Sequence, residues 1–452
     1  MKKAGIIVFW LAVWEFLSLA IHNSLILPSV GKTAGALVYI LGEKDLYRVL
    51  ANSLGRILAG FILAFAAGIV LAVCSYVRKT AEDFLSPLFL CIKAVPVASY
   101  VILLLFWQGS DMLSVGISFL VAVPVIYTNI LEGLKKTDRK LLEMADVFGI
   151  GKWNRVWYIY RSELRMPLFS CIKLACSMGV KAGVAAEIIG IPRDSFGEKL
   201  YMSKIYLSMD ELFAWTVIIV LSAFILEKGI LFLAEGIFCV PVYVAENAKI
   251  PGKEENQTEN TGTIHIENIT KKYGDRTLLH HYSLHLAKGD VAGIMAPSGS
   301  GKTTLFRIIL GLECVDDGTA EVCGAVSAVF QDTLLCEDTD VVTNMKLVSF
   351  GKKDTVRMAE ELLDREDLHK KCSLFSGGMK RRAAILRALT ADYDILLLDE
   401  PFVSLDDAAR RKAAEFVKKQ AQGKTILLFT HDKEDIKLLG GVCYESKSYV
   451  SG

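Results

Sequence analysis

The stretch that decides the fold is a glycine- and serine-rich loop at residues 296–304, Ala-Pro-Ser-Gly-Ser-Gly-Lys-Thr-Thr. An apolar, strand-like run precedes the loop at 291–295, and a helix-like run follows it at 304–310. This strand–loop–helix order is typical of a phosphate-binding loop, whose backbone N–H groups cradle phosphates. In such a loop the lysine reaches the β- and γ-phosphates, and the threonine after it holds Mg²⁺. The predicted nucleotide contacts are Pro297, Ser298, Gly299, Ser300, Gly301, Lys302, Thr303 and Thr304.

Apolar residues are distributed unevenly along the chain of 452 residues. Residues 1–245 contain long apolar runs, whereas 263–452 alternate apolar and charged residues as a soluble domain does. The polar stretch 246–262 between them has no apolar periodicity and is predicted to be a linker. The net charge of +1 does not indicate a nucleic-acid partner, and the ten scattered cysteines indicate neither a zinc site nor a disulfide framework.

Six segments of the first half are long and apolar enough to cross a lipid bilayer, which needs about 20 mostly apolar residues. The segment between the fourth and fifth spans is the richest in lysine and arginine, which places it in the cytoplasm. Six spans put the N-terminus and the soluble half on that same side. We therefore predict an all-α bundle of six membrane helices at 5–22, 54–77, 86–107, 112–131, 168–190 and 212–239.

Several charged residues fall inside or near these spans. A charge at the bilayer centre costs roughly 2.5–3.5 kcal/mol, so each is expected to face protein or water. A lined translocation path and pairing between helices both remain open as explanations. Lys181 and Glu187 are six residues apart and do not share a helical face. The charged residues are Glu15, Arg56, Lys93, Lys173, Lys181 and Glu187.

Polar residues that follow apolar runs complete a predicted hydrolysis site in the soluble half. Gln331 ends one run and is expected near the γ-phosphate and Mg²⁺. Asp399 and Glu400 end a second run, where Asp399 is expected to hold Mg²⁺ through water and Glu400 to polarise the attacking water. His431 ends a third and can contact the γ-phosphate and Glu400. The predicted catalytic residues are thus Glu400, His431 and Gln331, and the predicted metal site is Thr303, Gln331 and Asp399.

Further predicted nucleotide contacts lie outside the loop. Tyr273 precedes the loop and can stack on a base. Ser376, Gly377 and Gly378 precede a helix rich in arginine and alanine, and glycines before a helix N-terminus favour anion binding. Asp406 follows the carboxylate pair and completes the set.

With these motifs, residues 263–452 resemble the nucleotide-binding domain of an ATP-binding cassette (ABC) transporter. The resemblance implies an α/β P-loop ATPase with ATP and Mg²⁺ as cofactors. It also implies that ATP lies between the phosphate loop of one domain and the Ser376-Gly377-Gly378-Met379 signature of a second. One chain carries one of each, so a homodimer is expected.

The membrane half resembles the permeases of nitrate, sulfonate, taurine and pyrimidine-precursor importers. Glu143-Met144-Ala145, Gly149 and Pro167 are similar to the E-A-A…G…P motif of the importer coupling loop, here 132–167. In that family a short helix of the loop docks on the ATPase near the segment of Gln331. The order permease before ATPase in one chain, however, is typical of exporters.

The resemblance implies ATP-driven import of a small solute across the bacterial cytoplasmic membrane, with the ATPase in the cytoplasm. It also implies an extracytoplasmic solute-binding protein as a partner, and specificity within the solute class stays open. Two alternatives remain at this stage. One is an exporter of lipid or peptide, and the other is a membrane ATPase that transports nothing.

Overall fold

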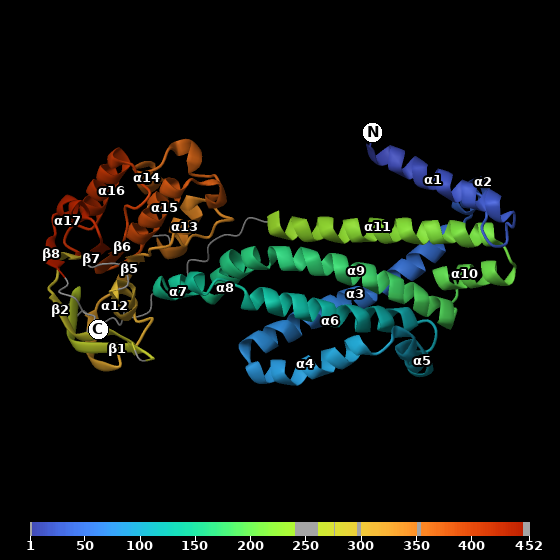
Figure 1. The fold of residues 1–452 in the computed structure, drawn as a ribbon, viewed down its shortest axis with the longest axis horizontal. Helices are drawn as coiled ribbons and strands as arrows, with labels where there is room; N and C mark the ends of the chain where they lie inside the picture. The colour runs from blue at the N-terminus through green and yellow to red at the C-terminus, as the bar shows by residue number, and fades with distance from the viewer. Residues whose placement is uncertain (1, 240–260, 275, 296–299, 350–353, 446–452) are drawn as a thin grey trace. The chain divides into compact units, whose positions relative to one another are not determined.

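The computed structural model describes residues 2–239, 261–274, 276–295, 300–349 and 354–445. The chain divides into two compact units, each of which is described by itself (Figure 1). The first unit consists of residues 1–136 and 163–240, and the second consists of 137–162 and 241–452. The second unit therefore contains most of the predicted coupling loop as well as the predicted ATPase. Residues 246–260 of the predicted linker lie outside the described residues.

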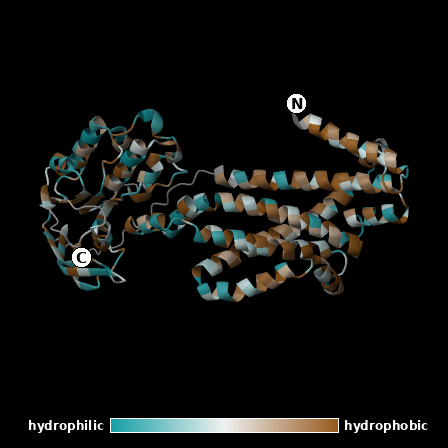
Figure 2. Ribbon diagram, viewed as in Figure 1, coloured by the Kyte–Doolittle hydropathy of each residue, from teal (hydrophilic) through white to brown (hydrophobic). Residues whose placement is uncertain are grey.

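The described residues of the first unit form helices and the turns that connect them, with no strand among them, as predicted. Its apolar helices stand out in Figure 2. They are α1 (Lys2–Ile21), α2 (Val30–Leu41), α3 (Leu46–Val77), α4 (Lys79–Ala94), α5 (Val97–Gln108), α6 (Leu113–Lys135), α9 (Arg161–Gly190), α10 (Phe196–Ile205) and α11 (Met209–Cys239).

Five helical stretches of the described chain are long and apolar enough to cross a membrane. The prediction of a single helix at 86–107 is wrong, because α4 and α5 meet there at an angle of 100°. Pro96 separates the two helices. Proline has no N–H to donate, and it disfavours the helical conformation of the residue before it, so a helix ends at this point. The described residues thus contain five helical stretches long and apolar enough to span a membrane, and one bent pair that counts as a sixth only if both halves are taken together.

Two shorter helices that the sequence did not predict, α2 and α10, lie in the connections at 23–53 and 191–211. Side chains of α1 fix the start of α2. Trp14 Nε1 donates a hydrogen bond to the Pro28 carbonyl at 3.0 Å, and Val30 N donates to Glu15 Oε2 at 2.8 Å. A carboxylate at a helix N-terminus is favourable, which gives Glu15 a structural partner.

A row of small residues on α3 packs against α6. Gly60, Ala64, Gly68 and Ala72 follow one another at intervals of four, and all four are buried. Small residues at this spacing let two membrane helices approach closely. A Cβ added at Gly60 would lie 2.4 Å from the Val115 carbonyl oxygen, so the contact is already at its limit.

Most of the predicted intramembrane charges have partners within the first unit. Glu187 is fully buried, and its two carboxylate oxygens accept hydrogen bonds from Ser53 Oγ at 2.8 Å and Ser114 Oγ at 3.3 Å. Lys93 Nζ donates to Thr128 Oγ1 at 2.9 Å. Arg56 forms an ion pair with Asp111, with 3.6 Å between Arg56 Nη2 and Asp111 Oδ1. The two other lysines, Lys173 and Lys181, lie on the exposed side of α9.

The second unit contains two sheets in its described residues. Strands β2 (Arg276–Leu286), β1 (Thr263–Tyr273) and β4 (Asp317–Cys323) pair antiparallel in that order. A parallel sheet has the order β5 (Val326–Val329), β6 (Ile395–Asp399), β7 (Thr425–Thr430), β3 (Val291–Met295) and β8 (Val442–Glu445). Every residue of β6 and β7 is buried, as expected for central strands of a parallel sheet covered on both faces.

The helices of the second unit include three short helical segments of the coupling loop: α7 (Arg139–Val147), α8 (Lys152–Arg155) and a π-helical turn (Val156–Tyr160). The ATPase part contributes α12 (Lys302–Ile309), α13 (Val341–Ser349), α14 (Thr355–Glu360), α15 (Gly377–Thr390), α16 (Asp407–Gln420) and α17 (Lys433–Leu439), with 3₁₀ turns at Arg365–Asp367 and Cys372–Leu374. The α/β fold of this part agrees with the prediction.

Replacing Gly60 with alanine tests the contact between α3 and α6. The added methyl group has no room beside the Val115 carbonyl, so we expect a lower midpoint of thermal unfolding for the purified chain in detergent. Gly55→Ala on the same helix is the matched control, because nothing lies within 4 Å of its Cβ position. Alanine is favoured over glycine within a helix by about 1 kcal/mol, so this control should be neutral or slightly stabilising. Equal midpoints for both variants would contradict the close approach.

Candidate active site

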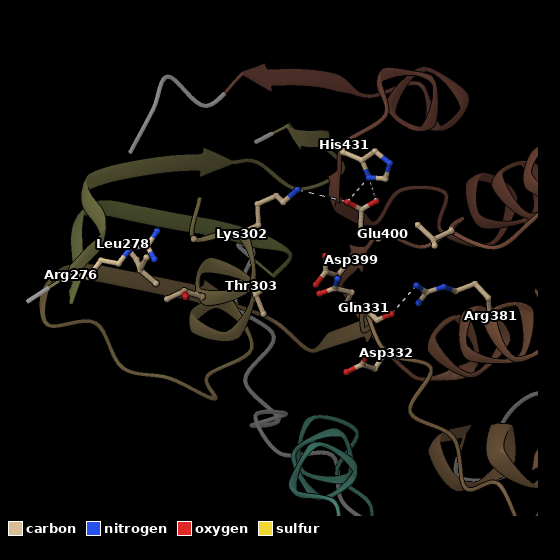
Figure 3. Close-up of a pocket in the computed structure, with 13 residues that line it drawn as sticks. Arg276, Leu278, Lys302, Thr303, Gln331, Asp332, Arg381, Asp399, Glu400 and His431 are labelled. Atoms are coloured by element: carbon tan, nitrogen blue, oxygen red, sulfur yellow. Dashed lines mark hydrogen bonds and ion pairs between the residues drawn. The ribbon is translucent and has the colours of Figure 1, made fainter. Parts of the chain in front are cut away.

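The loops that leave the carboxyl ends of the parallel strands surround a cavity of about 670 Å³. This edge of an open parallel sheet is where α/β proteins bind ligands. Figure 3 shows that the side chains come from segments far apart in the sequence. The cavity is lined by Arg276, Leu278, Gly301, Lys302, Thr303, Thr304, Gln331, Asp332, Arg381, Asp399, Glu400, Val403 and His431.

Glu400 is the centre of the polar contacts in the cavity. His431 Nδ1 lies 2.9 Å from both of its carboxylate oxygens, and Lys302 Nζ lies 3.7 Å from one of them (Figure 3). Its backbone has a φ of +48°, which is uncommon for a residue with a side chain. Strained backbone of this kind persists where the surrounding structure enforces it, commonly at functional sites. The predicted proximity of Glu400 and His431 is therefore present.

Asp399, the neighbour of Glu400, is 4% exposed at the end of β6. Burial, with the like charge of Glu400, raises the pKa of its carboxyl to about 6. Lys302 and Arg381 act in the opposite direction and favour the ionised form. An ionised carboxylate at this depth needs cations, which a bound metal would supply.

The residues present are suited to hold the predicted nucleotide and Mg²⁺. Ser300 Oγ is buried and has no hydrogen-bond partner among the described residues, so it is free to bond a ligand oxygen. Gly301 has a φ of +90°, a conformation that favours glycine. Thr303, Gln331 and Asp399 offer hydroxyl, amide and carboxylate oxygens, the hard ligands that Mg²⁺ prefers. Three predicted loop contacts, Pro297, Ser298 and Gly299, lie outside the described residues.

Arg381, which the sequence did not single out, holds the segment of Gln331 in place. Its Nη1 donates to the Phe330 carbonyl at 2.7 Å, and its Nη2 donates to the Gln331 carbonyl at 2.8 Å. Arg381 is 4% exposed, and burial lowers the pKa of its guanidinium. Its position on α15 gave no separate signal, because two further arginines occur on the same helix.

The other predicted contacts lie outside the cavity lining of their own chain. The Tyr273 hydroxyl bonds to Glu313. Burial and this bond raise the pKa of Tyr273, whereas a hydrogen bond with Thr304, a residue of the cavity, lowers it. Ser376 caps α15 by accepting a hydrogen bond from Met379 N, and Gly377 and Gly378 follow it. Asp406 caps α16 in the same way. Their predicted roles in nucleotide binding stay predictions.

A second arginine missed by the sequence analysis supports the segment around His431. Arg410 Nε donates to Asp435 Oδ1 at 2.7 Å, and its Nη2 donates to Asp432 Oδ2 at 2.6 Å. Thr430 Oγ1 donates to the other oxygen of Asp435 at 2.8 Å. Residues on both sides of His431 are thus tied to α16. Burial raises the pKa of Asp435, whereas the Glu434 N–H and Arg410 lower the pKa of Asp432.

The predicted coupling helix is α7, which packs into the core of the second unit. Met144 and Ala145 are 1% and 0% exposed and join the same apolar cluster as β6 and α15. Phe148 is the C-cap of α7, and Gly149 follows it with a φ of +62°, a conformation that favours glycine. Arg155 Nε closes the following turn by donating to the Ile150 carbonyl at 2.7 Å. The burial of Ala145 and the positive φ of Gly149 explain why the motif has a small residue and a glycine at these positions.

Ion pairs join α7 to the nucleotide-binding elements of the same unit. Arg307 of α12 donates to both oxygens of Glu143, at 2.7 and 3.0 Å. The hydrogen bond from Arg307 lowers the pKa of Glu143. Lys140 Nζ lies 2.5 Å from Asp332, the residue after Gln331. The coupling helix is therefore docked beside the Gln331 segment, as the resemblance implied.

Comparisons with known proteins agree with this geometry. Over 186 aligned residues, the chain is 35% identical to an aliphatic sulfonates import ATP-binding protein of Paracoccus denitrificans. The alignment covers 39% of this chain and 76% of that relative. The chain belongs to the ABC transporter family. The family model described as ABC transporter matches residues 279–403, and the one described as binding-protein-dependent transport system inner membrane component matches 50–233. The protein is a permease fused to an ATPase that couples ATP hydrolysis to transport.

Other relatives of this ABC transporter differ in their described activity. A Nod factor export ATP-binding protein of Paraburkholderia xenovorans is 36% identical over 39% of this chain and 65% of its own length. A sulfate/thiosulfate import ATP-binding protein of Mesostigma viride is 33% identical over 38% of this chain and 56% of its own length. Among solved structures, a dimeric post-hydrolysis cassette bound to ADP and Pi is 27% identical with a TM-score of 0.37, covering 41% of this chain and 94% of that one.

Arg410→Ala is expected to destabilise the ATPase part in a pH-dependent way. The substitution leaves Asp435 buried without its cation, which costs about 3 kcal/mol when the carboxyl is ionised. Because burial raises the folded-state pKa of Asp435, the ionised form grows as pH rises through that value, and stability is lost with it. The loss in unfolding midpoint should therefore be larger at pH 8 than at pH 5.

Lys419→Ala is the matched control for Arg410→Ala, because Lys419 on the same helix forms an exposed ion pair with Glu361 at 3.7 Å and no other ion pair among the described residues. It should leave the midpoint unchanged at both pH values. A loss for Arg410→Ala that does not depend on pH would show that the buried carboxylate is not its cause.

Proposed function

We propose that this chain is one half of an ATP-driven importer of small anionic solutes, acting as a homodimer in a bacterial cytoplasmic membrane. The observation that carries the proposal is the docking of α7, with Glu143 on Arg307 and Met144 and Ala145 in the ATPase core. This segment resembles the coupling loop of importer permeases. The match of residues 50–233 to a binding-protein-dependent permease supports the same direction.

Hydrolysis is assigned to the residues around Glu400. Glu400 accepts a proton from the attacking water. His431 orients the Glu400 carboxylate through the 2.9 Å contact. Lys302 and Thr303 bind the phosphates, and Arg381 fixes the backbone of Gln331. When bound at Thr303, Gln331 and Asp399, Mg²⁺ supplies positive charge that neutralises the β- and γ-phosphate oxygens. Glu400→Gln is accordingly expected to bind ATP without hydrolysing it.

The homodimer is proposed because one chain leaves the site incomplete. The signature residues Ser376, Gly377 and Gly378 are not among the described residues that line the cavity of their own chain. Two copies, arranged so that each signature meets the other's cavity, complete two sites.

The solute class rests on the lysines of the first unit. Lys173 and Lys181 lie on the exposed side of α9, within a stretch apolar enough to span a membrane. Lysine facing lipid at this depth is costly, so these side chains are expected to face a water-filled path. Two cations along such a path favour an anionic solute, of which nitrate and sulfonates are examples. The relative from Paracoccus denitrificans is described as a sulfonate import protein.

Export is a second candidate, because relatives at similar identity are described as Nod factor export proteins. The two directions differ in their partner. An importer of this family takes its solute from an extracytoplasmic binding protein, whereas an exporter needs none.

A tagged purification from native membranes after mild cross-linking tests the proposed function. We expect an extracytoplasmic solute-binding protein to be recovered with this chain alone and identified by mass spectrometry. A vesicle assay with the recovered binding protein should then show ATP-dependent uptake, and Lys181→Gln should reduce it. Recovery of no binding protein, together with ATP-dependent solute movement in the opposite direction, would contradict import. Recovery of a second fused half would contradict the homodimer.

A further inference from the structure

An arginine that has no acidic partner among the described residues lies in the core of the second unit. Arg387 of α15 is 2% exposed. Its Nη1 donates a hydrogen bond to the Leu334 carbonyl, whereas its Nε has no partner among the described residues. Burial lowers the pKa of its guanidinium to about 10, so Arg387 still carries its charge at neutral pH. A buried charge is costly unless nearby groups stabilise it.

Neighbouring thiols do not supply a negative charge to Arg387. Cys336 and Cys372 are 4% and 0% exposed. Burial raises the pKa of Cys336 to about 11 and that of Cys372 to about 12, so both remain neutral thiols. Within the part of the chain that the structure describes, no carboxylate forms an ion pair with Arg387.

The aromatic ring of Phe148 takes the place of an anion. Arg387 Cζ lies 4.8 Å from the ring centroid, and Phe148 is 4% exposed. A cation over an aromatic face is attracted by the ring quadrupole, more strongly when both are removed from water. Phe148 is the first residue after α7 and caps its C-terminal end. The contact therefore joins α15 directly to the coupling segment.

The helix that carries Arg387 also carries two other functional attachments. α15 begins at the signature, since Ser376 is its N-cap. One turn further, Arg381 binds the carbonyls of Phe330 and Gln331, and Arg387 binds that of Leu334. A single helix thus links the signature, the segment after β5 and, through Phe148, the coupling segment.

We propose that Arg387 is a positioning residue that passes movements of α15 to the coupling segment through the ring of Phe148. ATP binding at the signature displaces α15, and the buried guanidinium moves Phe148 with it because the two side chains are in direct contact, with Cζ 4.8 Å from the ring centroid. The residue touches neither nucleotide nor solute. The inference depends on membership of the ABC transporter family and holds for import and export alike.

Hydrogen exchange of the full chain in lipid nanodiscs tests this linkage. All proteins carry Glu400→Gln and are compared with and without Mg-ATP. With Phe148 intact, we expect ATP to change exchange both in α15 and in the helices of the membrane half. Phe148→Leu removes the ring and keeps most of the apolar volume. It should retain the response in α15 while reducing the response of the membrane helices by about fivefold or more.

Two further variants separate transmission from stability. Phe148→Tyr keeps the ring face and should restore the response of the membrane helices. Arg387→Lys keeps the charge but not the planar guanidinium, so it should behave as Phe148→Leu does. A full response of the membrane helices in both Phe148→Leu and Arg387→Lys would overturn the proposal.

Tyr393→Leu is the matched control, because Tyr393 is 4% exposed in the same core and lies under Lys424 at 5.9 Å. This variant also loses a ring beneath a cation, but away from the coupling segment. It should keep the response of the membrane helices even if it unfolds at a lower temperature. Equal loss of that response in Tyr393→Leu and Phe148→Leu would show a general effect of core destabilisation and would contradict a specific role for Arg387.

Discussion

The two-point ion pair between Glu143 and Arg307 is the contact on which the organisation of the second unit depends. Both hydrogen bonds are short, and the two side chains are 16% and 31% exposed. Paired, charge-assisted hydrogen bonds of this kind fix geometry as well as adding stability. Arg307 belongs to α12, whose first residue is Lys302. The pair therefore fixes a segment of the permease sequence to the helix that starts at the phosphate-binding loop.

Two further arginines, one buried and one partly buried, extend this arrangement through the ATPase part. Arg381 holds the backbone at Gln331, and Arg410 holds Asp432 and Asp435, which follow His431. Each guanidinium bonds to backbone carbonyls or carboxylates that the parallel sheet brings to one edge. Because these donors are planar and rigid, a movement of one helix shifts the residues they hold rather than stretching a flexible contact. The cavity around Glu400 and the surface that receives α7 are thus built from the same elements.

Sequence patterns predicted the features that depend on strand order. Gln331, Glu400 and His431 each follow a buried strand, and the carboxyl ends of parallel strands meet at one edge, so their proximity follows from the pattern. The apolar content of 86–107 predicts one span and does not reveal the break at Pro96, because prolines also lie inside helices of this chain, as Pro87 and Pro124 do. Arg381 and Arg410 gave no signal, since their partners lie 50 and 25 residues away and only the fold brings them together.

A double-mutant cycle on Glu143 and Arg307 tests most directly whether α7 is held to the ATPase by this pair. Glu143→Ala, Arg307→Ala and the double variant would be compared with the parent chain, with the opening free energy of the α7 amides measured by hydrogen exchange in the full-length protein. We predict an interaction energy of about 1–3 kcal/mol between the two residues. Effects of the two substitutions that add to within about 0.5 kcal/mol would contradict the account, because the pair would then contribute nothing to docking of the coupling helix.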